Sequence, residues 1–346
     1  MFWAEHEMTC LSCGGRTAPW THMPLDPIKG AENTHKDFVV CTECGLGAVS
    51  PMPSSEEIPS FYDTARYYTH GKSHLEEVNP TLLDRALHHV SWRFDKGQSL
   101  DPERIARDLP SGASICDLGC GGGDLLGRFK ALGFNVIGVD PDAAARAEAA
   151  KAGITVLAGT CEELPADLKG QSYDLVIMTH VLEHCRDPIL ALQKAFFLTR
   201  PGGMLFCEVP NCASTHFKSL GVCSAMFDAP RHLHFFTPAC LRRAISLSGF
   251  TFSGFQYMGY TRHHHASWRQ WEASIYDRTC QYTAHPSGRR HTVLRSIQLL
   301  LATAFASDEK KYDSVAVYGR RPHAPERAER HPDDVKDVVA EEYQWL

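Results

Sequence analysis

The feature that most constrains the fold is an apolar run that ends in a glycine-dense turn, Ile-Cys-Asp-Leu-Gly-Cys-Gly-Gly-Gly-Asp at residues 115–124. An amphipathic pattern follows it, with apolar side chains at positions 125, 126, 129 and 132. This order predicts a buried strand that leads into a helix through a turn free of obstructing side chains. Glycines let the backbone approach a ligand closely, and the first turn of a helix has free N–H donors. The sequence therefore predicts a loop that holds a nucleoside-like cofactor.

The residues around this loop indicate which cofactor it holds. The next apolar run, 134–140, ends at Asp140, where a ribose diol would lie if the two strands are adjacent and parallel. Dinucleotide-binding loops have the pattern G-x-G-x-x-G, but the third glycine counted from Gly119 would fall at Asp124. Asp117 is also a poor neighbour for a pyrophosphate. An acidic loop suits a sulfonium amino acid, which carries a positive sulfur and an ammonium group.

Five segments in this order resemble the motifs of the class I S-adenosylmethionine-dependent methyltransferases, over roughly residues 112–260. They are 117–123, 139–140, 159–165, 173–178 followed by 180–184, and 200–203 before 204–210. The resemblance implies cofactor contacts at Asp117, Gly119, Cys120, Gly121, Asp140, Pro141, Cys161, Glu162 and His180. The family often has an aspartate where this chain has Thr160. Contact with the adenine N6 would then fall to Glu162 or to backbone groups.

Strand-like and helix-like segments alternate along the core, which is typical of a parallel sheet. We predict strands at 114–118, 134–140, 155–158, 173–179, 204–210, 251–260 and 314–319, and helices at 123–132, 142–152, 187–199, 238–248 and 292–305. The fold class is α/β. The resemblance implies a doubly wound, seven-stranded, mostly parallel sheet with a Rossmann-like methyltransferase fold, whose last strand lies antiparallel beside the fifth.

Composition shifts divide the chain into six predicted parts. They are a zinc-binding ribbon at 1–53, a helical connector or lid at 54–111, the cofactor-binding core at 112–260, a helical insertion at 261–312, a last core strand at 313–321 and a mobile tail at 322–346. The resemblance implies that the connector, with Phe61, Tyr62, Tyr67 and Tyr68, covers the cofactor; ordinary half-buried packing is the alternative. In the tail, Tyr343 and Trp345 are candidates for docking.

Two C-x-x-C pairs, Cys10 with Cys13 and Cys41 with Cys44, have the spacing of a tetrahedral zinc site. Each pair is followed by a glycine that permits a tight turn. Four thiolates would fill the coordination sphere, so this site is predicted to be structural. The ion would stabilise a ribbon with little apolar content of its own.

Length and charge exclude several classes of protein. A chain of 346 residues with a formal charge of −6 is poorly suited to nonspecific nucleic-acid binding, which needs basic patches. It has no apolar stretch long enough for a membrane span, and its first residues lack the pattern of a signal peptide. Thirteen cysteines then indicate thiols or metal ligands in a reducing cytoplasm.

Four histidines are candidates for a general base. Methyl transfer from a sulfonium is a direct displacement, and a base is needed where the nucleophile carries a proton, as a hydroxyl does. His180 and His184 follow the fourth strand, and His184 occupies the histidine of the family's Leu-Glu-His edge. His232 and His234 lie in a segment that resembles a substrate-facing part of the family. The alternative for His184 is a hydrogen bond to a loop that shapes the pocket.

The insertion contains three consecutive histidines, His263, His264 and His265, which we expect in a solvated or substrate-facing loop because consecutive residues rarely converge on one ion. Trp268, Trp271 and Tyr276 form a helical stripe that favours packing in the core or in a homodimer. The basic residues of the insertion suggest an anionic substrate. They are Arg262, Arg269, Arg289 and Arg290.

These observations predict a methyltransferase that uses S-adenosylmethionine and a structural Zn²⁺ ion and acts on a small- or medium-sized substrate, such as a natural product or a peptide. Two alternatives stay open. The donor could be a derivative such as carboxy-S-adenosylmethionine, or the core could be a relic that binds a nucleoside without catalysis. The sequence predicts neither a nucleic-acid nor a membrane partner.

Overall fold

The computed structural model of the chain describes residues 9–30, 35–62, 75, 78–97, 100–284 and 286–323. Tyr67, Tyr68 and the tail residues Tyr343 and Trp345, for which we predicted roles, lie outside the described residues.

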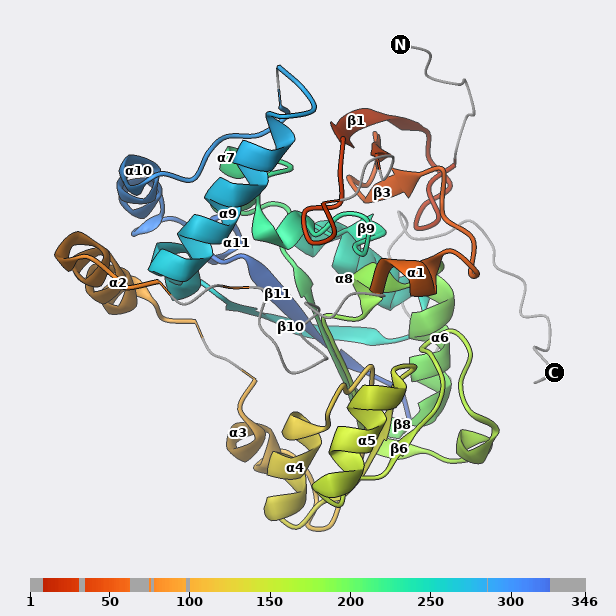
Figure 1. The fold of residues 1–346 in the computed structure, drawn as a ribbon. Helices are drawn as coiled ribbons and strands as arrows, with labels where there is room; N and C mark the ends of the chain where they lie inside the picture. Colours follow the sequence, from red (N-terminus) through yellow and green to blue (C-terminus); the bar gives the residue numbers. More distant parts are fainter. Residues whose placement is uncertain are drawn as a thin grey trace.

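A seven-stranded sheet forms the centre of the molecule, in the order β10-β11-β8-β7-β4-β5-β6 (Figure 1). Its strands are β4 (Ser114–Leu118), β5 (Asn135–Val139), β6 (Val156–Leu157), β7 (Tyr173–Thr179), β8 (Thr199–Pro210), β10 (Thr251–Met258) and β11 (Ser314–Arg320). The five strands from β4 to β8 pair in parallel, whereas β11 lies antiparallel between β8 and β10. The predicted α/β fold with a mostly parallel seven-stranded sheet is confirmed, including the position of the last strand.

Helices cover both faces of this sheet because its strands are apolar on both sides. Cys116 and Leu118 point to one face, where they pack with α6 (Pro188–Leu198) and α8 (Pro238–Leu247). Ile115 points to the other, where the cover is α3 (Pro102–Ala106), α4 (Asp124–Ala131) and α5 (Ala143–Lys151).

The start of α6 shows how local sequence sets a helix boundary. The Asp187 carboxylate accepts hydrogen bonds from the N–H groups of Ile189 and Leu190, and Pro188 occupies the first helical position. An N-cap aspartate satisfies N–H groups that have no partner inside the helix, and proline fits the first turn because it has no N–H to satisfy. The helix therefore begins immediately after the loop that contains His184.

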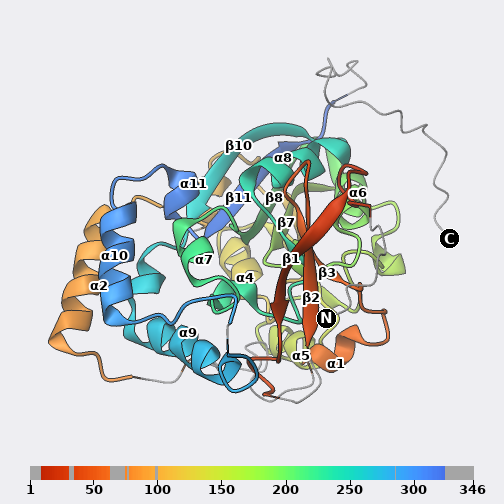
Figure 2. The same ribbon diagram turned by 90° about the horizontal axis from the view of Figure 1, so that it is seen from above.

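A second sheet joins the N-terminal ribbon to the core. Its order is β1 (Thr17–Met23), β2 (Lys36–Cys41), β3 (Gly47–Ser50) and β9 (His234–Phe235), all antiparallel (β1 to β3 in Figure 2, β9 in Figure 1). The last of these strands comes from the core segment, with Ala48 paired to His234. The ribbon is therefore continuous with the catalytic part of the sequence and not a free appendage.

The remaining helices lie on the periphery of the core. They are α1 (Ile58–Tyr62), α2 (Leu82–Phe94), α7 (Thr215–Leu220), α9 (Ala266–Thr279), α10 (Val293–Thr303) and α11 (Asp308–Lys311). Both views place α2 beside α10, with α9 next to them (Figures 1 and 2). Among the described residues, no helix combines the length and the apolar character that crossing a bilayer requires.

Candidate functional site

The glycine-rich loop after β4 and the acid after β5 lie at the same edge of the sheet. The two strands are parallel and in register, with Leu118 opposite Val139. The Asp140 carboxylate accepts hydrogen bonds from the N–H of Gly121 at 2.8 Å and from the N–H of Asp142 at 2.9 Å. Asp140 therefore fixes the loop and faces the place predicted for a ribose.

At two positions of this loop, Gly119 and Gly121, the backbone conformation favours glycine over residues with a side chain. Gly119 has a φ of +77°, and a Cβ there would lie 2.2 Å from Cγ2 of Val181. Gly121 has a φ of +52°, and a Cβ there would meet nothing within 4 Å. The first glycine is required by packing and by its backbone conformation. The second leaves open space at the loop, as a ligand that approaches the backbone would need.

Asp117 is a buried acid at the end of β4 and is 3% exposed. Burial, and then the charge of Asp140, raise its pKa to about 8. In the described part of the chain, no Lys, Arg or His forms an ion pair with it. A buried carboxylate of this kind fits a cationic ligand, because a nearby positive charge favours the ionised form.

The other predicted cofactor contacts lie around the same edge. Cys120 packs over β5, since a Cβ on Gly138 would lie 2.3 Å from its sulfur, and the carbonyl of Pro141 accepts a hydrogen bond from Arg146. Cys161 is buried. Glu162 accepts hydrogen bonds from the N–H groups of residues 186 and 187, so both of its oxygens help to hold the start of α6.

His180 bridges two buried glutamates. Its Nδ1 lies 3.2 Å from Oε1 of Glu183, and its Nε2 lies 3.2 Å from Oε1 of Glu208. Burial acts to lower the pKa of His180, but the charge of Glu208 and the hydrogen bonds to both carboxylates outweigh it and raise the pKa to about 10. The residue also has a φ of +54°, a strained conformation that persists only where its surroundings enforce it. His180 is therefore protonated at neutral pH and lies between two carboxylates.

His184 is arranged differently. Its Nδ1 lies 3.0 Å from the carbonyl oxygen of Arg231 and 3.0 Å from the hydroxyl of Tyr62. A carbonyl can only accept, so Nδ1 carries a proton, and in the neutral ring the lone pair is on Nε2. The side chain is partly exposed. His184 thus forms the hydrogen bond to a neighbouring loop that was the alternative for this residue.

His232 and His234 lie deeper. His232 donates from Nδ1 to the carbonyl of Met226 at 3.0 Å and packs edge-on against His184, with ring centroids 4.8 Å apart. Burial, and then His184, lower the pKa of His232 to about 4. His234 is 1% exposed on β9, where its Nδ1 lies 3.0 Å from the carbonyl oxygen of Cys185, and burial lowers its pKa to about 4. The structure brings His232 to the site edge and places His234 behind it.

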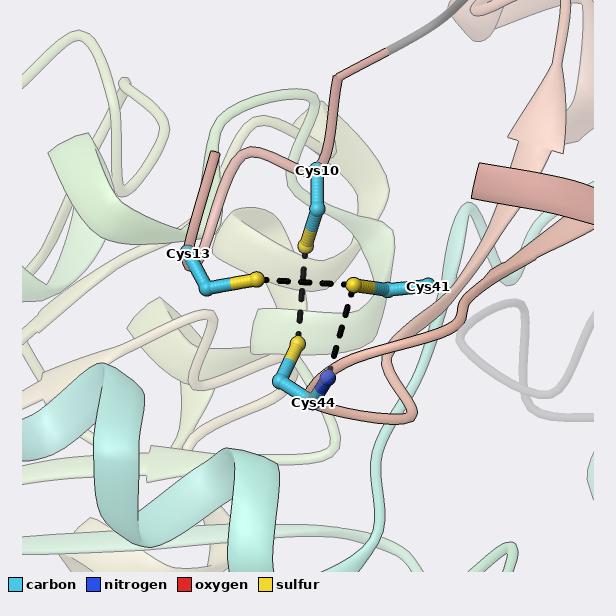
Figure 3. Close-up of side chains that lie close together, drawn as sticks. All are labelled: Cys10, Cys13, Cys41 and Cys44. Atoms are coloured by element: carbon cyan, nitrogen blue, oxygen red, sulfur yellow. Dashed lines mark hydrogen bonds between the residues drawn. The ribbon is translucent and has the colours of Figure 1, made fainter. Parts of the chain in front are cut away.

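The four ribbon cysteines converge on one point (Figure 3). The sulfurs of Cys10 and Cys44 are 3.5 Å apart, those of Cys13 and Cys41 are 3.4 Å apart, and all four lie within 4.8 Å of one another. Zn–S bonds of about 2.3 Å in a tetrahedron place sulfurs about 3.8 Å apart. Backbone N–H groups also point at the sulfurs, among them the N–H of Cys44 at Cys41. This donor set fits a zinc ion.

Sequence reasoning misplaced part of the insertion. His263 and His264 are 2% and 1% exposed, so the expected solvated loop is wrong for both, and only His265 is exposed. They are buried because the turn before α9 folds against α7 and the core, a tertiary contact without a local sequence signal. Three of the four insertion arginines form ion pairs, namely Arg262 with Asp313, Arg269 with Asp84 and Arg290 with Asp277.

Two further contacts near the site were not predicted from the sequence. Glu208 is a buried residue of β8, and its carboxylate lies 3.2 Å from Nε2 of His180. The pairing of Arg231 with Asp26 spans 205 positions, and no local pattern indicates it.

Asp117 supports a prediction about ligand-free stability. Its pKa is raised from 3.8 to about 8, so the folded chain binds more protons than the unfolded chain between these values, and stability falls as pH rises from about 4 to about 8. We expect Asp117→Asn to be more stable than the wild type at pH 8, by about 1–3 kcal/mol, and to bind S-adenosylmethionine at least tenfold more weakly. Thermal unfolding at pH 5 and pH 8 with titration calorimetry measures both. Asp124→Asn, an exposed acid in the same loop, is the control; unchanged donor affinity in Asp117→Asn would contradict the prediction.

Comparisons with known proteins agree with this geometry. A family model described as a methyltransferase domain matches residues 92–252. The ubiquinone biosynthesis O-methyltransferase of Cereibacter sphaeroides strain ATCC 17025 is 33% identical over 150 residues, which cover 41% of this chain and 57% of that protein. The enzyme of the same name from Methylobacterium sp. strain 4-46 is 32% identical over 188 residues, or 51% of this chain and 72% of that protein.

The chain belongs to the S-adenosylmethionine-dependent methyltransferase family. It spans a little over half, 57%, of the length of the first curated relatives that it matches. Solved structures are more distant. A methyltransferase of Thermotoga maritima is 19% identical with a TM-score of 0.42 and covers 69% of this chain and 91% of its own. A methyltransferase of Mesorhizobium loti is 18% identical with a TM-score of 0.41, and the match covers 63% of this chain and 96% of that protein. At these TM-scores neither likeness adds to the argument.

Proposed function

We propose that the chain transfers a methyl group from S-adenosylmethionine to a hydroxyl of a small- or medium-sized organic substrate. The observation that carries the proposal is the state of His184, whose Nδ1–H is fixed by the Arg231 carbonyl so that Nε2 can accept a proton. A base in this state is useful for a hydroxyl, which must lose its proton during transfer. The curated relatives are named O-methyltransferases, which supports the same choice.

The residues of the β4–β5 edge fit the donor. Asp140 would hold the ribose hydroxyls, and Asp117 would compensate the positive charges of the methionine part. When bound, the donor supplies an electrophilic methyl group on a positively charged sulfur. The chain contributes the rest: the loop binds and orients, while His184 removes the substrate proton and His180 holds Glu183 and Glu208 in place.

Two observations support an unmodified donor and an uncharged substrate. An arginine without an acidic partner would favour a carboxylated donor or an anionic substrate. Arg231 is bound to Asp26 and Asp228, and Arg262 is bound to Asp313. Both guanidinium groups are therefore neutralised within the chain.

The four cysteines hold a structural Zn²⁺ ion in this proposal. Four sulfur ligands leave no coordination position for substrate, and the cluster joins the turn before β1 to the turn between β2 and β3. The ion then acts on the reaction only through the position of the ribbon.

The test is to incubate purified protein with methyl-labelled donor and cell extract and to identify the labelled product by mass spectrometry. We expect an O-methylated small molecule together with S-adenosylhomocysteine. A product labelled on nitrogen or carbon would overturn the hydroxyl assignment. Donor binding without any product would favour a non-catalytic core, and mass spectrometry of the nucleoside that copurifies separates the two donors.

A further inference from the structure

Four histidines and one glutamate are buried together under α9, outside the site described above. His216 comes from α7, His263 and His264 from the turn before α9, Glu272 from α9 itself, and His291 from the segment before α10. None of the five is more than 2% exposed. Such a concentration of polar groups is costly unless each group has a partner.

Three of these side chains point their ligand atoms at one place. Nε2 of His216 lies 3.2 Å from Oε2 of Glu272, and Nδ1 of His291 lies 2.5 Å from the same oxygen. All three atoms lie within 4.8 Å of one another. They come from three separate elements, so their convergence is a product of the tertiary fold.

The outer atoms of two of these side chains are held by neighbours. Oε1 of Glu272 accepts hydrogen bonds from the N–H of Ala225 at 3.0 Å and from the indole N–H of Trp268 at 3.2 Å. Nε2 of His291 lies 2.8 Å from the hydroxyl oxygen of Ser296. Metal ligands are commonly oriented in this way, by hydrogen bonds to the atom that does not bind the metal. Oε2 and Nδ1 are thereby left facing each other and His216.

The same cluster holds several buried polar atoms that lack a hydrogen-bond partner among the described residues. They are Nδ1 of His216, Nδ1 of His263 and Nδ1 of His264, whereas Nε2 of His263 lies 3.2 Å from Oδ2 of Asp313. The rings of His216 and His263 stack with centroids 3.5 Å apart. Within the described residues, Glu272 forms ion pairs with imidazoles alone. A buried carboxylate without Lys or Arg, next to unsatisfied imidazoles, points to a missing ion or water.

We propose that His216, Glu272 and His291 bind a divalent transition-metal ion, separate from the ion of the four cysteines. Two imidazoles and a carboxylate are a donor set that suits Zn²⁺, Fe²⁺ or Co²⁺. Three protein ligands leave a fourth position for water. The ion would join α7, α9 and the segment before α10, and so fix the insertion to the core. This inference does not depend on the proposed reaction.

Metal analysis of the full chain tests it. After purification with Zn²⁺ in the buffer and removal of loosely bound metal, we expect two zinc ions per chain. Glu272→Gln should retain one, and the double substitution Cys10→Ser/Cys13→Ser should also retain one. His265→Ala is the matched control, because this neighbouring histidine is exposed, and should retain two. One ion per chain in the wild type, or two in Glu272→Gln, overturns the proposal.

A cobalt spectrum of the wild type keeps the test decisive if Glu272→Gln does not fold. Titration with Co²⁺ should fill two sites. One has the intense sulfur-to-cobalt charge-transfer band of a thiolate site, and the other has only weak visible bands because its ligands are nitrogen and oxygen. A titration that ends at one equivalent, with the thiolate band already complete, shows that the buried cluster binds no metal ion and contradicts the assignment.

Discussion

Replacing His184 with asparagine is expected to lower kcat by about 10²–10⁴-fold, the range that a positioned general base commonly contributes, with little change in donor affinity. The asparagine amide occupies the position of Nδ1, so it can still donate to the Arg231 carbonyl, which His184 contacts at 3.0 Å. It has no counterpart of Nε2. The substitution therefore removes the proton acceptor and leaves the hydrogen bond that positions the loop.

The measurement is steady-state kinetics across pH, together with titration calorimetry of the donor. Because a base must be unprotonated, the rate of the wild type should fall at low pH, and this fall should disappear in His184→Asn. His265→Asn, an exposed histidine outside the site, controls for loss of an imidazole. If His184→Asn keeps more than a tenth of the wild-type kcat, His184 is not the base.

His180 does not compete for this role at neutral pH. Two carboxylates hold it as a cation, and its pKa is raised to about 10 despite its burial. A group that already carries its proton cannot accept another. The two histidines of one short segment therefore have different surroundings, because His180 lies between two glutamates and His184 faces a backbone carbonyl. Their spacing in the sequence alone does not distinguish them.

Much of the fold follows from local patterns. Apolar runs with turns at their ends gave the positions of β4, β5, β7 and β11 within one residue, because strands buried on both faces are continuously apolar. The glycine turn and the acid after the second strand were also predicted to lie at one edge of the sheet, and the structure places them there. Each of these signals lies within about ten consecutive residues, so it needs no knowledge of tertiary contacts.

The rest depends on contacts between distant segments. β9 is two residues long and joins the ribbon sheet only because Ala48 lies opposite His234. The burial of His263 and His264 depends on α7 and α9 meeting around them. The ion pair between Arg231 and Asp26 connects the two parts of the chain. None of these has a periodic pattern, so the sequence showed the residues but not their partners.

If the four cysteines hold Zn²⁺ as proposed, its loss should reduce both the stability of the chain and its catalytic rate, because long-range contacts connect the ribbon to His184. The guanidinium of Arg231 is fully buried and bound to Asp26 of the ribbon at 3.0 Å, while the carbonyl of the same residue orients His184. Backbone hydrogen bonds also connect the ribbon to the segment that contains His184. The N–H of Val49 donates to the carbonyl of Leu233, and the N–H of Leu233 donates to the carbonyl of Glu183. The ribbon therefore supports the backbone that holds the proposed base.

We expect Cys10→Ser/Cys13→Ser, or treatment with a strong chelator, to lower the free energy of unfolding by at least about 3 kcal/mol, a modest share of the 10–16 kcal/mol that zinc contributes to small zinc-dependent folds. The kcat should fall at least tenfold. Zinc content, thermal unfolding and kinetics measure these effects, and Cys280→Ser, an exposed cysteine outside the cluster, should change none of them. Asp26→Asn separates the effect of the metal from the effect of the Asp26–Arg231 ion pair. This variant should keep its zinc because the four sulfurs stay in place, and it should still lose activity because the contact to Arg231 is broken. Full activity in a zinc-free chain would show that the ribbon and His184 are independent.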